Sequence, residues 1–144
     1  MLVRLLYASR ATHAITPEFI DAILVRSREH NPNLGITGVL CWGGDIFMQA
    51  LEGGRSAVNA LYSEIVRDDR HRDVVLLHYE EIGERRFAGW TMGQVNLAKI
   101  NPSLLLKHSE RPTLDPYNMP GPASMALLDE LIATASIVNR TCGN

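Results

Sequence analysis

A chain of 144 residues suits one domain with a substantial core, and its 46% hydrophobic and 21% charged residues are ordinary for a globular protein. The formal net charge of −2 provides no basic surplus, so we expect no nucleic-acid partner. The sequence shows no run of about 18 apolar residues, no signal-peptide pattern and no metal-ligand or disulfide framework, so we expect a cytoplasmic protein with no membrane span and no metal site.

The N-terminal part of the chain predicts a strand followed by a helix. Residues 2–9 alternate in side-chain direction with apolar residues on one face, which is typical of a β-strand. The helix begins with Thr16 as its N-cap and Pro17 at its first helical position, and apolar residues recur along one side of it at helical spacing. We expect the helix to end at Asn31, because Pro32 disfavours the α conformation of the residue before it.

A hairpin is predicted next, from strands at residues 36–42 and 45–53 joined by a glycine-rich turn. Residues 46–51 are apolar on both faces of the second of these strands except for Gln49, so this strand is expected to be central and covered on both sides. A buried amide group left without a partner costs roughly 1–3 kcal/mol. Gln49 therefore needs a hydrogen-bond partner, which could be a neighbouring polar side chain or a loop carbonyl.

The rest of the chain predicts a second helix, two further strands and a helical tail. Residues 55–68 form an amphipathic helix, and residues 73–81 contain an apolar run typical of a strand. Residues 90–97 predict a fifth strand. Several prolines follow, and residues 123–138 then predict a long helix with an apolar stripe.

The element order βαββαββ predicts an α+β fold, in which a ferredoxin-like sheet carries two helices on one face. We expect residues 1–97 to form this domain and residues 98–144 to form a C-terminal helical extension that packs on the sheet or forms an oligomer interface. Right-handed crossovers place the third strand beside the first, so Tyr7 and Gln49 lie on adjacent central strands. Tyr7 is then the candidate partner of Gln49.

The groove between the two helices collects further residues of interest. Asn31 lies at the end of the first helix, and Ile23 and Ile65 project from the two helices toward the same groove. Apolar walls with convergent amides suit a flat heterocycle with ring carbonyls and nitrogens. The alternative is that Tyr7 and Gln49 are core partners with nothing bound, and that Asn31 only caps a helix end.

Five motifs in register now identify a resemblance that covers roughly residues 2 to 97. The motifs are residues 3–10 (VRLLYASR), 27–38 (SREHNPNLGITG), 47–53 (FMQALEG), 69–72 (DRHR) and 86–92 (RFAGWTM). With these motifs the chain is similar to the BLUF domain, a blue-light sensor that uses flavin, and its tail resembles the two-helix extension of short, stand-alone members. Two departures are Asp69, where the family more often has proline, and Glu64, where several relatives carry a basic residue.

The resemblance implies a role for each matching residue. Tyr7 matches the light-driven electron and proton donor to the flavin, and Gln49 matches the amide that bridges the tyrosine and the flavin and rearranges after excitation. Trp90 and Met92 match fifth-strand residues that relay the change outward, which completes a photoactive set of four. The cofactor-binding residues that the resemblance implies are Tyr7, Ile23, Ser27, His30, Asn31, Gln49, Ile65, Arg70 and His71.

The implied function is that of a photoreceptor rather than an enzyme. The flavin is expected to be bound non-covalently, with FAD usual in the family and FMN or riboflavin possible. With no cyclase or phosphodiesterase domain expected in the chain, the signal should pass to a separate, unknown effector protein, and the apolar stripe of the tail predicts a homo-oligomer. The alternative function is a small flavin-dependent redox enzyme, and an RNA-binding module or a cofactor-free adaptor fits the residues less well.

Overall fold

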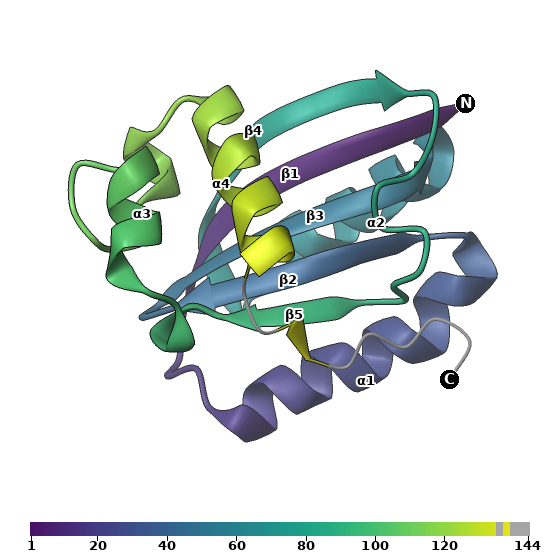
Figure 1. Ribbon diagram of the computed structural model, residues 1–144. Helices are drawn as coiled ribbons and strands as arrows, with labels where there is room; N and C mark the ends of the chain where they lie inside the picture. The colour runs from purple at the N-terminus through teal and green to yellow at the C-terminus, as the bar shows by residue number, and fades with distance from the viewer. Residues whose placement is uncertain (135–136, 139–144) are drawn as a thin grey trace.

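The computed structural model describes residues 1–134 and 137–138, which form a mixed sheet with helices on both faces (Figure 1). Within these residues, none of the helices combines the length and hydrophobicity needed to cross a membrane. The elements are β1 (Leu2–Ala11), α1 (Pro17–Leu34), β2 (Thr37–Gly43), β3 (Ile46–Gly54), α2 (Arg55–Arg67), β4 (His71–Ile82), β5 (Gly93–Asn96), the 3-10 turn η1 (Leu97–Lys99), α3 (Pro102–His108), the 3-10 turn η2 (Pro116–Asn118), α4 (Gly121–Thr134) and β6 (Ile137–Val138).

The sheet has the strand order β4-β1-β3-β2-β5-β6, and its first four strands have the predicted ferredoxin-like arrangement. β1 pairs antiparallel with both β3 and β4, and β2 pairs antiparallel with β3 and parallel with β5. β3 is therefore central, and all its residues but the last are buried. The pairing sets Tyr7 directly opposite Gln49, which confirms that these residues lie on adjacent central strands.

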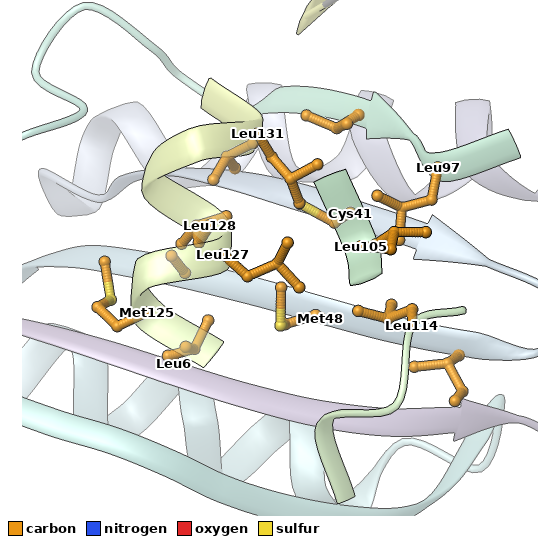
Figure 2. Close-up of a cluster of buried hydrophobic side chains, with 14 of the residues drawn as sticks. Leu6, Cys41, Met48, Leu97, Leu105, Leu114, Met125, Leu127, Leu128 and Leu131 are labelled. Carbon is orange, nitrogen blue, oxygen red and sulfur yellow. The ribbon is translucent and has the colours of Figure 1, made fainter. Parts of the chain in front are cut away.

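Two hydrophobic cores lie on opposite faces of the sheet. The helices α1 and α2 cover one face, as predicted, and α3 and α4 lie over the other (Figure 1). We call the first cluster, which includes Leu5, Leu24, Leu40, Leu51 and Val58, the cavity-side core. We call the second, which includes Leu6, Cys41, Met48, Leu128 and Leu131, the α4-side core (Figure 2).

Helix α1 begins as predicted and ends later than predicted. The side chain of Thr16 accepts a hydrogen bond from the backbone N–H of Phe19 at 3.1 Å, which is an N-cap. The helix continues through Pro32 to Leu34, so the expected end at Asn31 is wrong. A proline removes only one helical N–H, and Gly35, in the left-handed conformation at φ 70°, closes the last turn by donating to the carbonyls of Asn31 and Pro32.

Strands β2 and β3 approach each other closely at Gly38. A β-carbon at this position would lie 2.1 Å from the backbone oxygen of Ala50, which no real side chain tolerates. The N–H of Gly38 donates to the backbone oxygen of Trp90 at 3.2 Å. The glycine therefore allows the close approach to Ala50, and its N–H joins the segment before β5 to the sheet.

Strand β5 is shorter than predicted. It begins at Gly93, so Trp90 and Met92 lie in the irregular segment that precedes it and are not strand residues. The ladder between β2 and β5 starts only at the pair Val39 and Gly93. The sequence pattern predicted a strand here because the segment is rich in apolar residues. These residues pack in two different cores, with Trp90 on the α4-side core and Met92 in the cavity-side core.

Helix α4 packs on the sheet through Leu127, Leu128 and Leu131 (Figure 2). The predicted helix end at residue 138 is wrong, because Ile137–Val138 pair with β5 as a short strand. Residues 135–136 and 139–144, with Cys142, lie outside the described residues. At the other end, a β-carbon on Gly121 would lie 2.1 Å from the backbone oxygen of Leu77 in β4.

Candidate functional site

A cavity of about 430 Å³ opens between α1, α2 and the strands β1 and β3. Its volume lies within the range of small-molecule binding sites. The nine residues predicted to bind a cofactor all line it: Tyr7, Ile23, Ser27, His30, Asn31, Gln49, Ile65, Arg70 and His71. The fold thus gathers side chains from both halves of the domain around one space.

Tyr7 and Gln49 form the floor of this cavity. The phenol of Tyr7 donates a hydrogen bond to Oε1 of Gln49 at 2.6 Å, and both residues are buried. Burial raises the pKa of the Tyr7 phenol well above its ordinary value, with Tyr62 and Asp68 adding to the effect. The phenol therefore stays protonated at neutral pH and remains a donor to Gln49.

The second group of the Gln49 amide points at Met92. The Nε2 of Gln49 lies 3.4 Å from Sδ of Met92, and thioether sulfur is a weak acceptor. The guanidinium of Arg28 on α1 donates to the backbone oxygen of Met92 at 3.2 Å and holds the segment in place. Trp90 lies elsewhere, stacked on Phe87 with ring centroids 5.7 Å apart.

Asn31 presents a carboxamide to the cavity. The residue is 4% exposed and lies in the last turns of α1. No hydrogen bond joins its side chain to another of residues 1–134, whereas its backbone oxygen accepts from Gly35 and Ile36. The carboxamide lines the cavity, where its donor and acceptor groups can meet the polar edge of a ligand.

His71 also contacts Tyr7, and the two rings meet edge to face with centroids 6.4 Å apart. Its Nε2 contacts the backbone oxygen of Ile65, which can only accept, so the proton is assigned to Nε2. In the neutral ring Nδ1 then accepts from the hydroxyl of Ser9 at 2.8 Å. These contacts fix the ring at the cavity wall.

Charged residues surround the cavity near the end of α2. Arg70 and Asp68 form an ion pair at 2.5 Å, and the hydrogen bonds from Arg70 lower the pKa of the Asp68 carboxyl. Arg26 and Glu64 line the same part of the cavity. The resemblance predicted Arg70 as a site residue but not Arg26 or Asp68. Charged residues near a helix end usually face solvent, so their presence in the sequence does not indicate a site.

Apolar lining residues were also missed as site residues. Phe19, Leu40, Phe47 and Leu61 line the cavity together with the predicted isoleucines. Their helical or strand periodicity predicted burial, and nothing in it distinguishes a residue that faces a cavity from one that faces the core.

The chemistry of the lining fits a flavin ring. Ile23 and Ile65 supply apolar surface for the two faces of a flat ring, and Asn31 and Gln49 supply amide groups for its carbonyl and nitrogen edge.

Comparison with known proteins agrees with this geometry. The family described as "Sensors of blue-light using FAD", or BLUF, matches residues 2–93. Photoactivated adenylate cyclase subunit beta of Euglena longa is 39% identical over 92 residues, which are 63% of this chain and 11% of that subunit. The blue light- and temperature-regulated antirepressor BluF of Escherichia coli (strain K12) is 31% identical over 87 residues, which are 60% of this chain and 22% of the antirepressor.

Two solved structures match over nearly the whole chain. The photo-activated state of BlsA superposes with a TM-score of 0.83 at 31% identity, covering 94% of this chain and 99% of that one. The dark-state structure of the BLUF protein BlrB gives a TM-score of 0.77 at 35% identity, covering 92% and 95%. The fold, the matched residues and the relatives agree: this chain belongs to the BLUF family of flavin-using blue-light sensors.

Proposed function

We propose that this chain is a blue-light photoreceptor in which Tyr7 is the light-driven electron and proton donor and Gln49 is the group whose hydrogen bonds rearrange. The observation that carries the proposal is the 2.6 Å hydrogen bond from Tyr7 to Gln49 at the floor of a cavity lined by amides and isoleucines. The bond holds a phenol one amide away from the space that a flavin would occupy.

The residues around the cavity divide into holders of the ring and holders of the tail. Ile23 and Ile65 would hold the two faces of the ring, and Asn31 would bind its C4 carbonyl edge. Ser27 and His30 line the same wall of α1. Arg70 and His71 would face the polar edge or the phosphate side, and FAD is proposed as the physiological form because the family description names FAD.

Bound flavin supplies a ring that absorbs blue light and becomes a strong oxidant when excited. Tyr7 would give up an electron to that ring, and the proton of its phenol would leave along the hydrogen bond to Gln49. Both would return to Tyr7 on recombination, leaving Gln49 rotated or in its other tautomer, so that it presents a different group to the cavity. Because each arrangement must satisfy its buried polar groups, intermediate arrangements are costly and the network has two states. No covalent bond to the protein is needed, and Cys41, whose pKa burial raises to about 12, stays protonated in the α4-side core.

The output is proposed to be a change in contacts with a separate effector protein. The Euglena relatives are named photoactivated adenylate cyclase subunits, which supports coupling of this domain type to an effector activity. Self-association of the chain is proposed from the exposed Leu106 on α3, because the apolar stripe of α4 is buried against the sheet. Light scattering of the purified protein in darkness and after illumination tests this part.

The experiment that tests the function is an absorption spectrum of the purified protein, recorded in darkness and again after blue light. We expect a yellow protein whose flavin band moves to longer wavelength and recovers in darkness. A yellow protein without this shift would point to a flavin-dependent redox enzyme, which bleaching by a nicotinamide cofactor would identify. A colourless protein that also fails to bind added flavin would contradict the proposal.

A further inference from the structure

Glu52 is a buried carboxylate in the sheet. It lies three positions after Gln49 on β3, and because side chains alternate along a strand it points to the face opposite Gln49, toward α4. It is 0% exposed. A charge taken out of water is costly unless it is paired and hydrogen-bonded, so the groups that meet this carboxylate matter.

Four donors converge on the carboxylate of Glu52. Arg4, on the neighbouring strand β1, approaches Oε2 with Nε and with Nη2, both at 2.7 Å. The backbone N–H of Arg86 donates to Oε2 at 3.0 Å, and the backbone N–H of Phe87 donates to Oε1 at 2.7 Å. Two of the four donors therefore belong to one short stretch of backbone far along the chain.

This stretch belongs to the loop at residues 83–92, which ends at Met92. The loop lies outside the β-ladder, since β5 begins only at Gly93. It is fastened to the sheet by the Glu52 carboxylate and by Arg85, which donates to the hydroxyl of Thr37 at 2.9 Å. The position of Met92 against Gln49 thus depends on anchors at the start of the loop as well as on its own contacts.

The same stretch also contacts α4. The guanidinium of Arg86 pairs with Asp129, and Phe87 is buried in the α4-side core. Phe87 stacks on Trp90, which packs on the same core. The loop thus contacts the Gln49 network at Met92 and helix α4 at Arg86, and Glu52 holds it between the two.

We propose that the contact of Met92 with Gln49 in this structure belongs to the dark arrangement, and that Glu52 is a positioning residue whose carboxylate holds the loop at residues 83–92 so that Met92 keeps this contact. The proposal rests on the proposed photoreceptor function for its kinetic consequence. Loss of the anchor removes a contact that favours the dark arrangement of Gln49, so the return from the lit state becomes slower. Arg4 acts with Glu52 by compensating its charge.

The test uses Glu52→Gln in the full chain with flavin bound. This variant keeps the size of the side chain and loses its charge and one full acceptor. We expect dark recovery to slow by about fivefold, the lower end of typical coupling between linked sites. The methyl resonance of Met92 should shift in darkness, and the amides of Arg86 and Phe87 should exchange faster with solvent. Glu81→Gln is the matched control, because it removes a carboxylate paired with Arg55 on the exposed surface.

A double-mutant cycle with Met92→Leu separates positioning from a general loss of stability. If Glu52 acts through Met92, Glu52→Gln adds little to the recovery rate once Met92 has been replaced. If the two substitutions change the recovery rate by independent factors that multiply in the double variant, the proposal is overturned. An unchanged Met92 resonance in Glu52→Gln would overturn it as well.

Where Glu52→Gln fails to fold, the paired variant Arg4→Met with Glu52→Leu leaves no unpaired buried charge and still removes the acceptor of the loop amides. Where the wild-type protein shows no red shift, the photoreceptor function fails. The Met92 resonance and the exchange of the loop amides still decide, without light, whether Glu52 positions the loop.

Discussion

The amide nitrogen of Gln49 lies 3.4 Å from the sulfur of Met92. Because the phenol of Tyr7 donates to Oε1, the orientation of the amide is fixed, and Nε2 must face the sulfur. A thioether accepts hydrogen bonds weakly, so little free energy holds the amide nitrogen in this position. Gln49 is thus strongly held on one side and weakly held on the other, which supports the proposed rearrangement.

Replacement of the phenol tests the donor role. Tyr7→Phe should retain flavin and lose the light-induced red shift, because the ring shape is kept and the ionisable hydroxyl is removed. It should also lower the free energy of unfolding by about 1–3 kcal/mol, since Oε1 of Gln49 loses its donor. Difference spectra and chemical denaturation measure the two effects. Tyr62→Phe is the control, with its ring centroid 5.7 Å from that of Tyr7, and a red shift that survives in Tyr7→Phe would exclude the donor role.

Replacement of the amide tests the rearrangement. Gln49→Leu has similar size and should bind flavin, but it has no group that can exchange partners, so the normal lit-state spectrum should be absent. Gln94→Leu makes the same change at a buried site on β5 and should keep the spectrum. Equal spectra in the two variants would contradict a special role for Gln49.

The carboxamide of Asn31 is expected to bind the flavin ring. Asn31→Ala should weaken flavin binding about tenfold, which corresponds to the loss of a single hydrogen bond worth about 1–1.5 kcal/mol. Asn33→Ala, at an exposed position of the same helix, is the control. Titration of the apoprotein with FAD measures both, and the same titration with FMN and riboflavin shows how much the phosphates contribute.

The raised pKa of Tyr7 gives a pH dependence with a definite sign. An unfolded chain ionises tyrosine near its ordinary pKa of 10.0, whereas burial holds the pKa of Tyr7 in the folded protein higher. The contribution of the Tyr7 phenol to the free energy of unfolding is therefore fully present below about pH 10. It is lost as pH rises above this value, because the unfolded state releases the proton first. Chemical denaturation at about pH 9 and pH 11 should show a larger loss of stability in wild type than in Tyr7→Phe. The red-shift amplitude should stay constant up to about pH 10, and an earlier decline would show that the phenol is not protected.

The close approach at Gly38 predicts a steric effect. Gly38→Ala should lower the free energy of unfolding by about 1–3 kcal/mol, because the added carbon meets the backbone oxygen of Ala50. It should also loosen the attachment of Trp90, whose backbone oxygen accepts from Gly38. Gly54→Ala is the control, since a β-carbon there meets nothing within 4 Å. Thermal denaturation of the pair checks the prediction, and equal midpoints would refute it.

Much of the candidate site could be predicted from local patterns. The alternation of apolar residues in β3 identified Gln49 as a buried polar exception, and the handedness of crossover connections placed Tyr7 beside it. The register between β1 and β3 confirms that pairing. These predictions succeed because strand alternation and crossover handedness follow from backbone geometry and do not depend on distant contacts.

The rest depends on contacts between residues far apart in the chain. Pro32 was expected to end α1, but Gly35 closes the helix beyond it. The resemblance implied two helices in the tail, but the residue pattern gave no bounds for α3, because the many prolines of this region obscured the capping by Asn101 and the start at Pro102. Glu52 stood in a motif without a role, since a glutamate near a strand end usually reaches solvent, and only the fold shows that the loop before β5 encloses it.

The close approach of Gly121 to the backbone of Leu77 fixes the first residue of α4 against β4. The first residue of the helix is pressed against β4 so tightly that a single added carbon would overlap the strand. This end therefore cannot move closer to the sheet, and a lateral shift of the whole helix would have to displace β4. The helix is joined to the loop at its middle, where Asp129 pairs with Arg86, and residues 137–138 return to the sheet beside β5. A displacement of the loop would therefore reach α4 first at Asp129, so a spin label beside Asp129 should report a larger light-induced displacement than one near Gly121.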